Sequence, residues 1–277
     1  MIKESEIKAL VALLDDSDSE IVAHVESKLL SLGDPVIPLL EDAWEKQGDP
    51  AVQQRLEDII HNLQLSTLVN RLRQWHEKGG VNLLKGMWVI TTYLYPTITY
   101  QDLKKEVDQL YYEAWLDFRY DMQPFDQVKM LNSIFYGKLK FKPDTKNFHS
   151  PSNSMINRVI ETRKGNPISL CTVYMMIANK LKLPIYGVNL PNLFILTYKN
   201  DYTHFYINVF NKGLVFSKAD IDNYIANLNM QPVESYYEPC SHIDIIRRVI
   251  NNLIVSFTKT GNKQKVEELK KLLEVLR

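Results

Sequence analysis

Several features that would place a protein in a familiar class are scarce or missing in this sequence of 277 residues. It has two cysteines, Cys171 and Cys240, which are too few for a disulfide framework. Cysteine and histidine do not occur at the spacing of a zinc site, and no glycine-rich phosphate-binding loop is present. No apolar run is long enough to cross a membrane. We therefore expect no metal, no cofactor and no membrane partner.

A net positive charge is also absent, because 33 basic residues balance 33 acidic ones. The electrostatic attraction that dominates nucleic-acid affinity is missing, and we expect no nucleic-acid partner. The charges are unevenly distributed: residues 1–65 hold 14 acidic and five basic side chains, a net charge of −9 that leaves +9 for the rest. This acidic segment is either a solvated surface or a module that docks on a basic partner or on the basic part of its own chain.

The first residues give an expectation about location. Met1-Ile2-Lys3-Glu4 leads directly into an amphipathic pattern, without the basic and apolar segments of a secretory signal. One of the two cysteines also lies in a helix that is predicted to be buried, so we expect its thiol to be reduced. These features favour a cytoplasmic protein, and no pattern in the sequence indicates its oligomeric state.

The stretch from 163 to 184, RKGNPISLCTVYMMIANKLKLP, predicts the central element of the fold. Gly165-Asn166 favours a turn, and Pro167 suits the first position of a helix. The helix that follows is apolar on nearly every side, which is typical of a buried helix. Three short apolar runs at 185–190, 194–198 and 205–210 then predict strands. We expect a mostly helical α+β fold in which this helix packs against a small antiparallel sheet.

The N-terminal half is predicted to be helical. Breaks at Gly33-Asp34-Pro35 and Gly48-Asp49-Pro50 divide residues 1–65 into short helices. Residues 66–136 continue as helices rich in tryptophan and tyrosine, and we expect these aromatic side chains to pack in the core rather than to form a stacking surface for bases or sugars. The carboxylates of this region have helical spacings without a histidine on the same face, so we interpret them as a solvated face rather than a metal site.

The segment 137–152, GKLKFKPDTKNFHSPS, is lysine-rich and contains several helix breakers. We interpret it as an exposed connection into the central helix. Two alternatives stay open: a loop that covers a cleft or meets a partner, and a basic surface from Lys138 to Lys146 that contacts RNA. Towards the C-terminus, Ser217 with Asp220 and Ser241 with Asp244 have the spacing of capping boxes, which predicts helices after each of them.

Three parts of the chain resemble known families. The stretch LVALLDDSDSEIVAHVESKLLSLGDPVIPLLEDA resembles a HEAT repeat. The motif NRVIETRKGNPISL at 157–170, followed by LPNLF at 190–194 and NVFNKG at 208–213, resembles the bacterial SirB-type transglutaminase-like family, and the last two predicted helices resemble a tetratricopeptide-like unit. The resemblances imply a HEAT-like segment over 1–65, a transglutaminase-like core with a papain-like fold over 66–235, and a tetratricopeptide-like helix pair over 236–277.

The transglutaminase resemblance also implies where catalytic groups would lie. Such enzymes place a cysteine at the start of the buried helix and supply histidine and aspartate from the sheet. By this resemblance Pro167 occupies the cysteine position, Leu193 the histidine position and Asn208 the aspartate position. We therefore interpret the chain as a catalytically degenerate member that binds or scaffolds another protein or a peptide.

Two further sets of residues follow from the same resemblance. The candidate lining of a residual binding cleft is Gly165, Asn166, Ser169, Asn192 and Asn211. The rival interpretation is a cysteine-dependent acyl transferase or hydrolase, with Cys171 as nucleophile and His204 as base. A cysteine in the middle of a buried helix lacks the accessible, electropositive setting that lowers a thiol pKa, so we favour a core role for Cys171.

Overall fold

The computed structural model describes residues 4–277 and divides the chain into two compact units. The first ends at Arg71 and the second begins at Leu72, so the division falls inside helix α4 (Pro50–Glu77). The end of the acidic segment predicted at residue 65 lies within the same helix. Between residues 4 and 277, no helix combines the length and the apolar character that a membrane crossing requires.

The first unit is built from α1 (Glu4–Ala12), α2 (Ser19–Ser31), α3 (Ile37–Lys46) and the first part of α4. The predicted breaks are confirmed. Gly33 has φ +74°, a conformation that favours glycine, and a 3₁₀ turn from Asp34 to Val36 follows it. Asp18 caps α2 by accepting a hydrogen bond from the Glu20 N–H at 2.9 Å.

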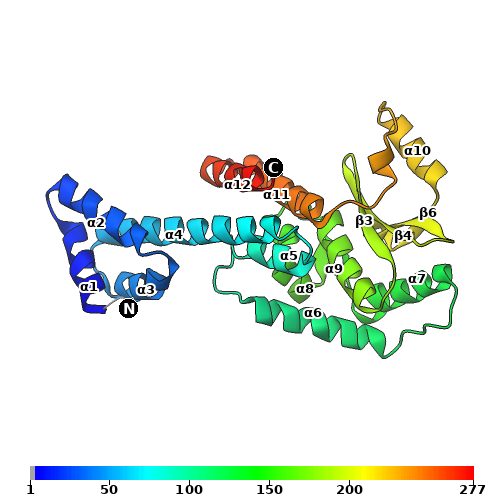
Figure 1. Ribbon diagram of the computed structural model, residues 1–277, viewed down its shortest axis with the longest axis horizontal. Coiled ribbons are helices and arrows are strands. Elements are labelled where there is room, and N and C mark those ends of the chain that lie inside the picture. The colour runs from blue at the N-terminus through cyan, green and yellow to red at the C-terminus, as the bar shows by residue number, and fades with distance from the viewer. Residues whose placement is uncertain (1–3) are drawn as a thin grey trace. The chain divides into compact units, whose positions relative to one another are not determined.

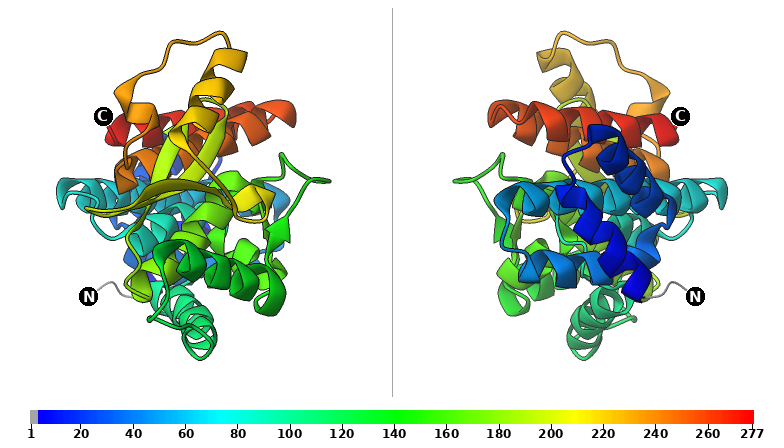
Figure 2. Two further views of the ribbon diagram at one scale, coloured as in Figure 1. Left: turned by 90° about the vertical axis from the view of Figure 1, so that its right-hand side faces the viewer. Right: turned by 90° about the vertical axis from the view of Figure 1, so that its left-hand side faces the viewer.

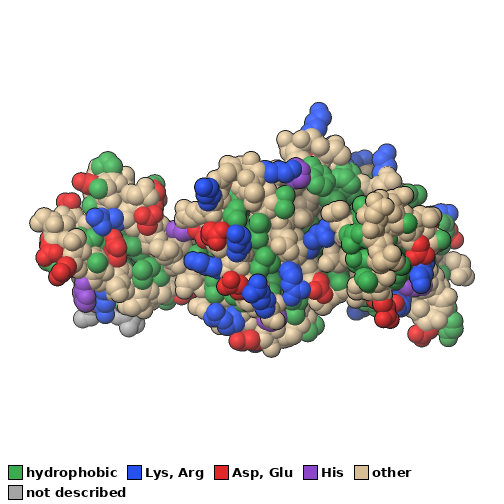
Figure 3. All heavy atoms as spheres, turned by 90° about the horizontal axis from the view of Figure 1, so that it is seen from above, with side chains coloured by type: hydrophobic (Ala, Val, Ile, Leu, Met, Phe, Trp, Pro, Cys, Tyr) green, Lys and Arg blue, Asp and Glu red, His purple; other side chains and the backbone are tan. Residues whose placement is uncertain are grey.

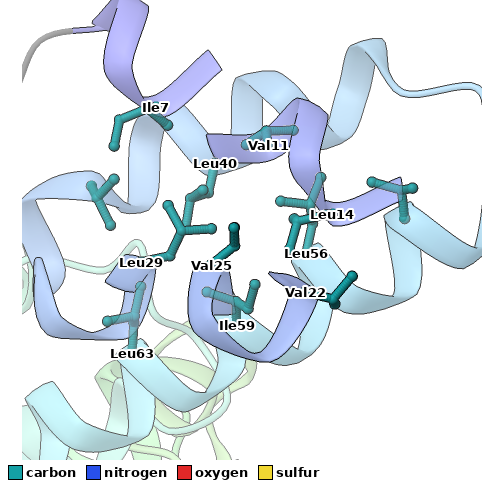
Figure 4. Close-up of a cluster of buried hydrophobic side chains, with 12 residues drawn as sticks. Ile7, Val11, Leu14, Val22, Val25, Leu29, Leu40, Leu56, Ile59 and Leu63 are labelled. Atoms are coloured by element: carbon teal, nitrogen blue, oxygen red, sulfur yellow. The ribbon is translucent and has the colours of Figure 1, made fainter. Parts of the chain in front are cut away.

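Apolar side chains of the four helices form the core of this first unit (Figure 4). Leu29, Leu40 and Leu56 are fully buried there. Acidic side chains are spread over its visible face in Figure 3. In the same unit, Glu26 accepts a hydrogen bond from Arg55 at 3.1 Å. All the residues of this core belong to the first unit.

The second unit contains the rest of the helices and both sheets. Its helices are α5 (Leu83–Thr91), α6 (Tyr100–Trp115), α7 (Pro124–Asn132), α8 (Ile156–Thr162), α9 (Pro167–Lys180), α10 (Lys218–Asn227), α11 (His242–Lys259) and α12 (Lys263–Val275). Its strands are β1 (Lys142–Pro143), β2 (Lys164–Gly165), β3 (Ile185–Leu190), β4 (Leu193–Lys199), β5 (His204–Asn208) and β6 (Leu214–Phe216).

Helix α9 is the buried centre of the second unit, as predicted (Figure 1). It packs against β3 and β4 of a four-stranded antiparallel sheet with the order β3-β4-β5-β6. The other face of the sheet meets α10, where Val188 and Ile195 pack with Ile221 (Figure 2). Since side chains alternate along a strand, neighbouring residues of β4 face α9 and α10 in turn.

The C-terminal helices form a hairpin of two packed helices, α11 and α12. Ser241 and Asp244 make the predicted capping box at the start of α11. Besides α12, this helix contacts α5 and α9. Because α11 touches the central helix, one of its faces is available to line whatever lies at the beginning of α9.

Three expectations about individual segments need correction. The segment 137–152 is not simply an exposed connection, because Phe141 is 1% exposed and stacks on Phe135 with ring centroids 4.5 Å apart. The third predicted strand ends at Asn208, and the short strand β6 was not expected. The aromatic residues of 66–136 are not all in the core, since Trp115 is 49% exposed.

Gly213, between β5 and β6, allows a test of the packing beneath the sheet. It has φ +71°, and a Cβ there would lie 2.2 Å from Asn132 Oδ1, which accepts a hydrogen bond from Tyr174. Gly261 has φ +73° but no atom near its Cβ position. We predict that Gly261→Ala lowers the free energy of unfolding by about 1 kcal/mol through backbone strain alone, and Gly213→Ala by at least about 2–3 kcal/mol.

Urea unfolding followed by tryptophan fluorescence measures both losses. Gly261→Ala is the matched control, because it carries the same backbone strain without the collision. Equal losses in the two variants would contradict the close packing of Gly213 against Asn132.

Candidate functional site

The start of α9 is held by a capping box. The Asn166 side chain accepts a hydrogen bond from the Ser169 N–H at 3.1 Å, and the Ser169 hydroxyl accepts one from the Asn166 N–H at 3.1 Å. Asn166 Nδ2 also donates to Ser154 Oγ at 2.9 Å. Pro167 follows at the first helical position, where no backbone N–H is needed. The polar atoms of the motif are thus used to begin a buried helix.

The residues before this cap are fixed just as tightly. Gly165 is required because a Cβ there would lie 2.4 Å from Ser169 Oγ. Its strand, β2, pairs in parallel with β1. Arg163 ends α8 in the left-handed conformation, and its guanidinium lies over the Phe141 ring at 5.0 Å. The sequence RKGNP therefore has a structural explanation at almost every position.

A cavity of about 190 Å³ opens at the beginning of α9. We call it the α9 cavity. Three of its walls are the loop before α8, the first turn of α9, and the β3–β4 turn with the start of β4. They contribute Phe148 and His149, Pro167 and Ile168, and Asn192 and Phe194. The sequence left open whether the segment 137–152 covers a cleft. Phe148 and His149 of that segment do line this cavity.

The fourth wall is one face of α11. Its residues Arg248, Asn252, Val255 and Ser256 follow the i, i+4, i+7 and i+8 spacing of a helix face. Arg248 Nη1 donates to Asn189 Oδ1 at 3.0 Å and to the Leu190 carbonyl at 3.2 Å. The Ser256 hydroxyl donates to the Asn252 carbonyl at 2.8 Å. This wall was not predictable from the sequence, because helical periodicity predicts a face of a helix but not the surface that the face meets.

The three positions of the expected triad do not converge on the cavity. Pro167 lines it. Leu193 packs instead against the apolar cluster between the sheet and α10. Asn208 accepts a hydrogen bond from the Asn211 N–H at 3.1 Å and so shapes the turn after β5. Only Pro167 therefore occupies a place where it could meet a ligand in the α9 cavity.

The candidate cleft residues divide in the same way. Asn166 and Asn192 line the α9 cavity. Gly165 and Ser169 are buried behind the helix cap, and Asn211 is exposed in the turn after β5. Asn192 has φ +57°, a left-handed conformation that asparagine tolerates better than most residues.

Cys171 and His204 lie at different ends of β4. The Cys171 thiol is fully buried and points at the Phe194 carbonyl, 3.6 Å away, at the start of the strand. His204 is exposed and pairs with Lys199 at the end of the strand. Five residues of strand separate the two places, roughly 17 Å at the usual rise. The structure does not bring this nucleophile and this base together.

The pKa shifts of Cys171 and His204 also disfavour a catalytic pair. Burial raises the pKa of the Cys171 thiol. Burial and the nearby Lys199 lower the pKa of His204. A reactive cysteine needs the opposite environment, accessible and electropositive, with an imidazolium beside it.

The α9 cavity itself holds no catalytic pair. Its lining has one hydroxyl, Ser256, whose bond goes to a backbone carbonyl, and one imidazole, His149, which is exposed. No carboxylate belongs to the lining, so nothing there would orient the imidazole as a base. In the part of the chain that the structure describes, no group of three His, Cys, Asp or Glu side chains is placed to hold a metal ion. Among the residues that line the cavity, no hydroxyl or thiol is therefore paired with a base.

Comparison with known proteins places the central part of the chain in a family. A family model described as the transglutaminase-like superfamily matches residues 101–251. The chain is 26% identical over 168 residues to the UPF0162 protein YchA of Escherichia coli, covering 59% of this chain and 62% of that protein. It is 39% identical over 70 residues to the UPF0162 protein PM0557 of Pasteurella multocida, covering 25% of this chain and 26% of that protein.

A eukaryotic protein is also similar. The mouse F-box only protein 21 is 24% identical over 153 residues, which are 52% of this chain and 24% of that protein. The chain thus spans between about a quarter and 62% of the length of these curated relatives. No solved structure matches it.

The burial of the two thiols generates a prediction about alkylation. Burial raises the pKa of Cys171, and it raises the pKa of the half-buried Cys240 to about 12. Almost no thiolate is therefore present near neutral pH, and we expect iodoacetamide to leave Cys171 unmodified in the folded protein. Intact-mass measurement over time follows the reaction, and urea-unfolded protein is the control in which both thiols react. Rapid alkylation of Cys171 in the folded chain would contradict this placement.

Proposed function

This chain belongs to the transglutaminase-like superfamily, and from that premise we propose that it is a catalytically degenerate member that binds another protein. In this proposal the α9 cavity receives a segment of the partner and does not cut or join it. The chain then acts as a binding or scaffold module. The positions that resemble the superfamily's catalytic residues, Pro167, Leu193 and Asn208, carry no nucleophile, base or carboxylate.

One observation carries the proposal. The place where the superfamily begins its catalytic helix is here an open cavity without a nucleophile and base pair. Losing one member of a catalytic triad costs several orders of magnitude in rate, so a cavity without all three has no route to covalent acyl transfer. Its volume of about 190 Å³ and its mixture of aromatic, amide and guanidinium groups suit the capture of a single residue of a partner.

We also infer a narrower family, a cellular location and roles for the two helical ends of the chain. We infer a SirB-type protein of the bacterial cytoplasm, in which residues 1–65 act as a HEAT-like layer and the α11–α12 hairpin as a tetratricopeptide-like unit. Helix pairs of both kinds commonly present extended binding surfaces. The acidic first unit then adds a surface for a basic partner, while the α9 cavity supplies the specific contact.

The competing function is a cysteine-dependent acyl transferase or hydrolase that uses Cys171 and His204. It would require the thiol to leave its buried position and the two groups to approach across the length of β4. No observation in the second unit favours that rearrangement, so we retain it only as the outcome that would overturn the proposal.

Blocking the α9 cavity tests the proposed function. Val255 lines the cavity and is 46% exposed, so Val255→Trp fills the opening without disturbing the core. We predict that this variant loses the partners captured by the wild-type chain from its native cell, because the bulky ring excludes the bound segment. The measurement is quantitative mass spectrometry of the captured proteins.

Thr258→Trp is the matched control, since Thr258 is exposed on the same helix and does not line the cavity. It should capture the wild-type set of partners, and both variants should melt near the wild-type temperature. Unchanged capture by Val255→Trp would contradict the proposal, as would wild-type acyl transfer or hydrolysis that disappears in a Cys171→Ser variant.

A further inference from the structure

Arg248 carries a positive charge that no acidic side chain neutralises. Its hydrogen bonds go from Nη1 to two neutral oxygens, the Asn189 amide and the Leu190 carbonyl. No carboxylate among residues 4–277 makes an ion pair with it. The adjacent Arg247 differs, because it pairs with Asp244 at 2.5 Å and donates from Nη2 to the Leu276 carbonyl. An arginine that is partly buried and held by neutral groups alone still favours a negative partner.

The geometry around Arg248 leaves donors for such a partner. A guanidinium has five N–H groups in a planar fork, and the two bonds above use only Nη1. The N–H groups of Nε and Nη2 have no acceptor in the described chain, and neither nitrogen is a buried unpaired atom. They therefore reach solvent, and Arg248 is one of the residues that line the α9 cavity. Burial lowers the pKa of Arg248, in keeping with an uncompensated charge.

The rest of the lining is also suited to a negative group. Asn192 and Asn252 supply amides, and no aspartate or glutamate belongs to the lining. Ile168 is the second residue of α9. Its backbone N–H has no acceptor within the helix, because the carbonyl four residues earlier lies before the helix begins. The positive end of the helix dipole adds to the field of Arg248. The lining of the cavity thus offers donors and positive charge together.

The size of the cavity and its apolar lining residues limit what can accompany the negative group. Its volume of about 190 Å³ equals that of roughly six water molecules, and it lies below the range of about 300–1,000 Å³ that is usual for drug-sized ligands. Phe148, Phe194 and Val255 supply apolar surface to the lining. The cavity therefore suits a carboxylate attached to one compact apolar group rather than a nucleotide or a large cofactor.

We propose that the α9 cavity binds the C-terminal carboxylate of a partner polypeptide that ends in a compact aliphatic residue. The carboxylate pairs with the free donors of Arg248, and the aliphatic side chain packs against the phenylalanines. This inference rests on the proposed function and specifies the ligand of the same cavity. A carboxylate could also come from an aspartate side chain within a chain, and the experiment separates the two sources.

Three small probes test the proposal on the full chain. N-acetyl-leucine presents a terminal carboxylate beside an aliphatic group, N-acetyl-leucinamide removes only the charge, and N-acetyl-aspartic acid α-amide presents a side-chain carboxylate. Ligand-observed NMR titration measures their dissociation constants. We expect N-acetyl-leucine to bind at least about tenfold more tightly than its amide, since a charge-assisted hydrogen bond is lost. The aspartate probe should bind more weakly than N-acetyl-leucine, because it lacks the aliphatic group.

Substitutions locate the charge that makes the difference. Arg248→Gln should abolish the preference for acid over amide, and Arg248→Lys should keep part of it. Arg247→Gln is the matched control, because the neighbouring arginine is also hydrogen-bonded but does not line the cavity, and it should keep the full preference. Arg248 also holds β3, so the melting temperature of each variant is measured alongside.

Equal binding of acid and amide by the wild-type chain would overturn the inference, even if Arg248→Gln fails to fold. A preference that survives in a folded Arg248→Gln variant would overturn it too, and tighter binding of the aspartate probe would reassign the carboxylate to a side chain. Failure of the proposed function looks different. There, Val255→Trp would leave partner capture unchanged whichever probe binds.

Discussion

The capping box between Asn166 and Ser169 is the interaction on which the rest of the second unit depends. It starts α9 at a fixed residue, and the ten residues after Pro167 are buried without exception up to Ile177. A buried helix cannot leave the polar groups of its first turn without partners, so the cap, the proline and the glycine before them are required together. The sheet, α10 and α11 are then arranged around this helix.

The same constraint supports the proposal that the cavity binds a ligand without reacting with it. In a cysteine enzyme, the first turn of the central helix presents the nucleophile and lowers its pKa. Here the helix begins with Pro167, and the only cysteine in the helix, Cys171, lies one turn further in, against the Phe194 carbonyl. The same helix start that would activate a thiolate is therefore free to attract a negative group of a ligand.

Local chemistry was predictable from the sequence to the extent that neighbouring residues determine it. The caps at Ser217 and Ser241, the breaks in the first unit and strands β3 and β4 all follow from propensity and spacing. Features set by distant contacts were not predictable. Phe141 is buried in a polar segment because it stacks on Phe135, and Arg248 lines the cavity because α11 returns to α9 across most of the second unit.

The most direct test of whether the cavity binds without catalysing a reaction is a search for a covalent acyl-enzyme. The folded chain is incubated with an activated acyl ester, and its intact mass is measured before and after hydroxylamine treatment. We expect no acyl adduct, because neither Cys171 nor Ser256 is paired with a base. A hydroxylamine-sensitive adduct on Cys171, lost in denatured protein, would contradict the proposal that this cavity binds a partner without reacting with it.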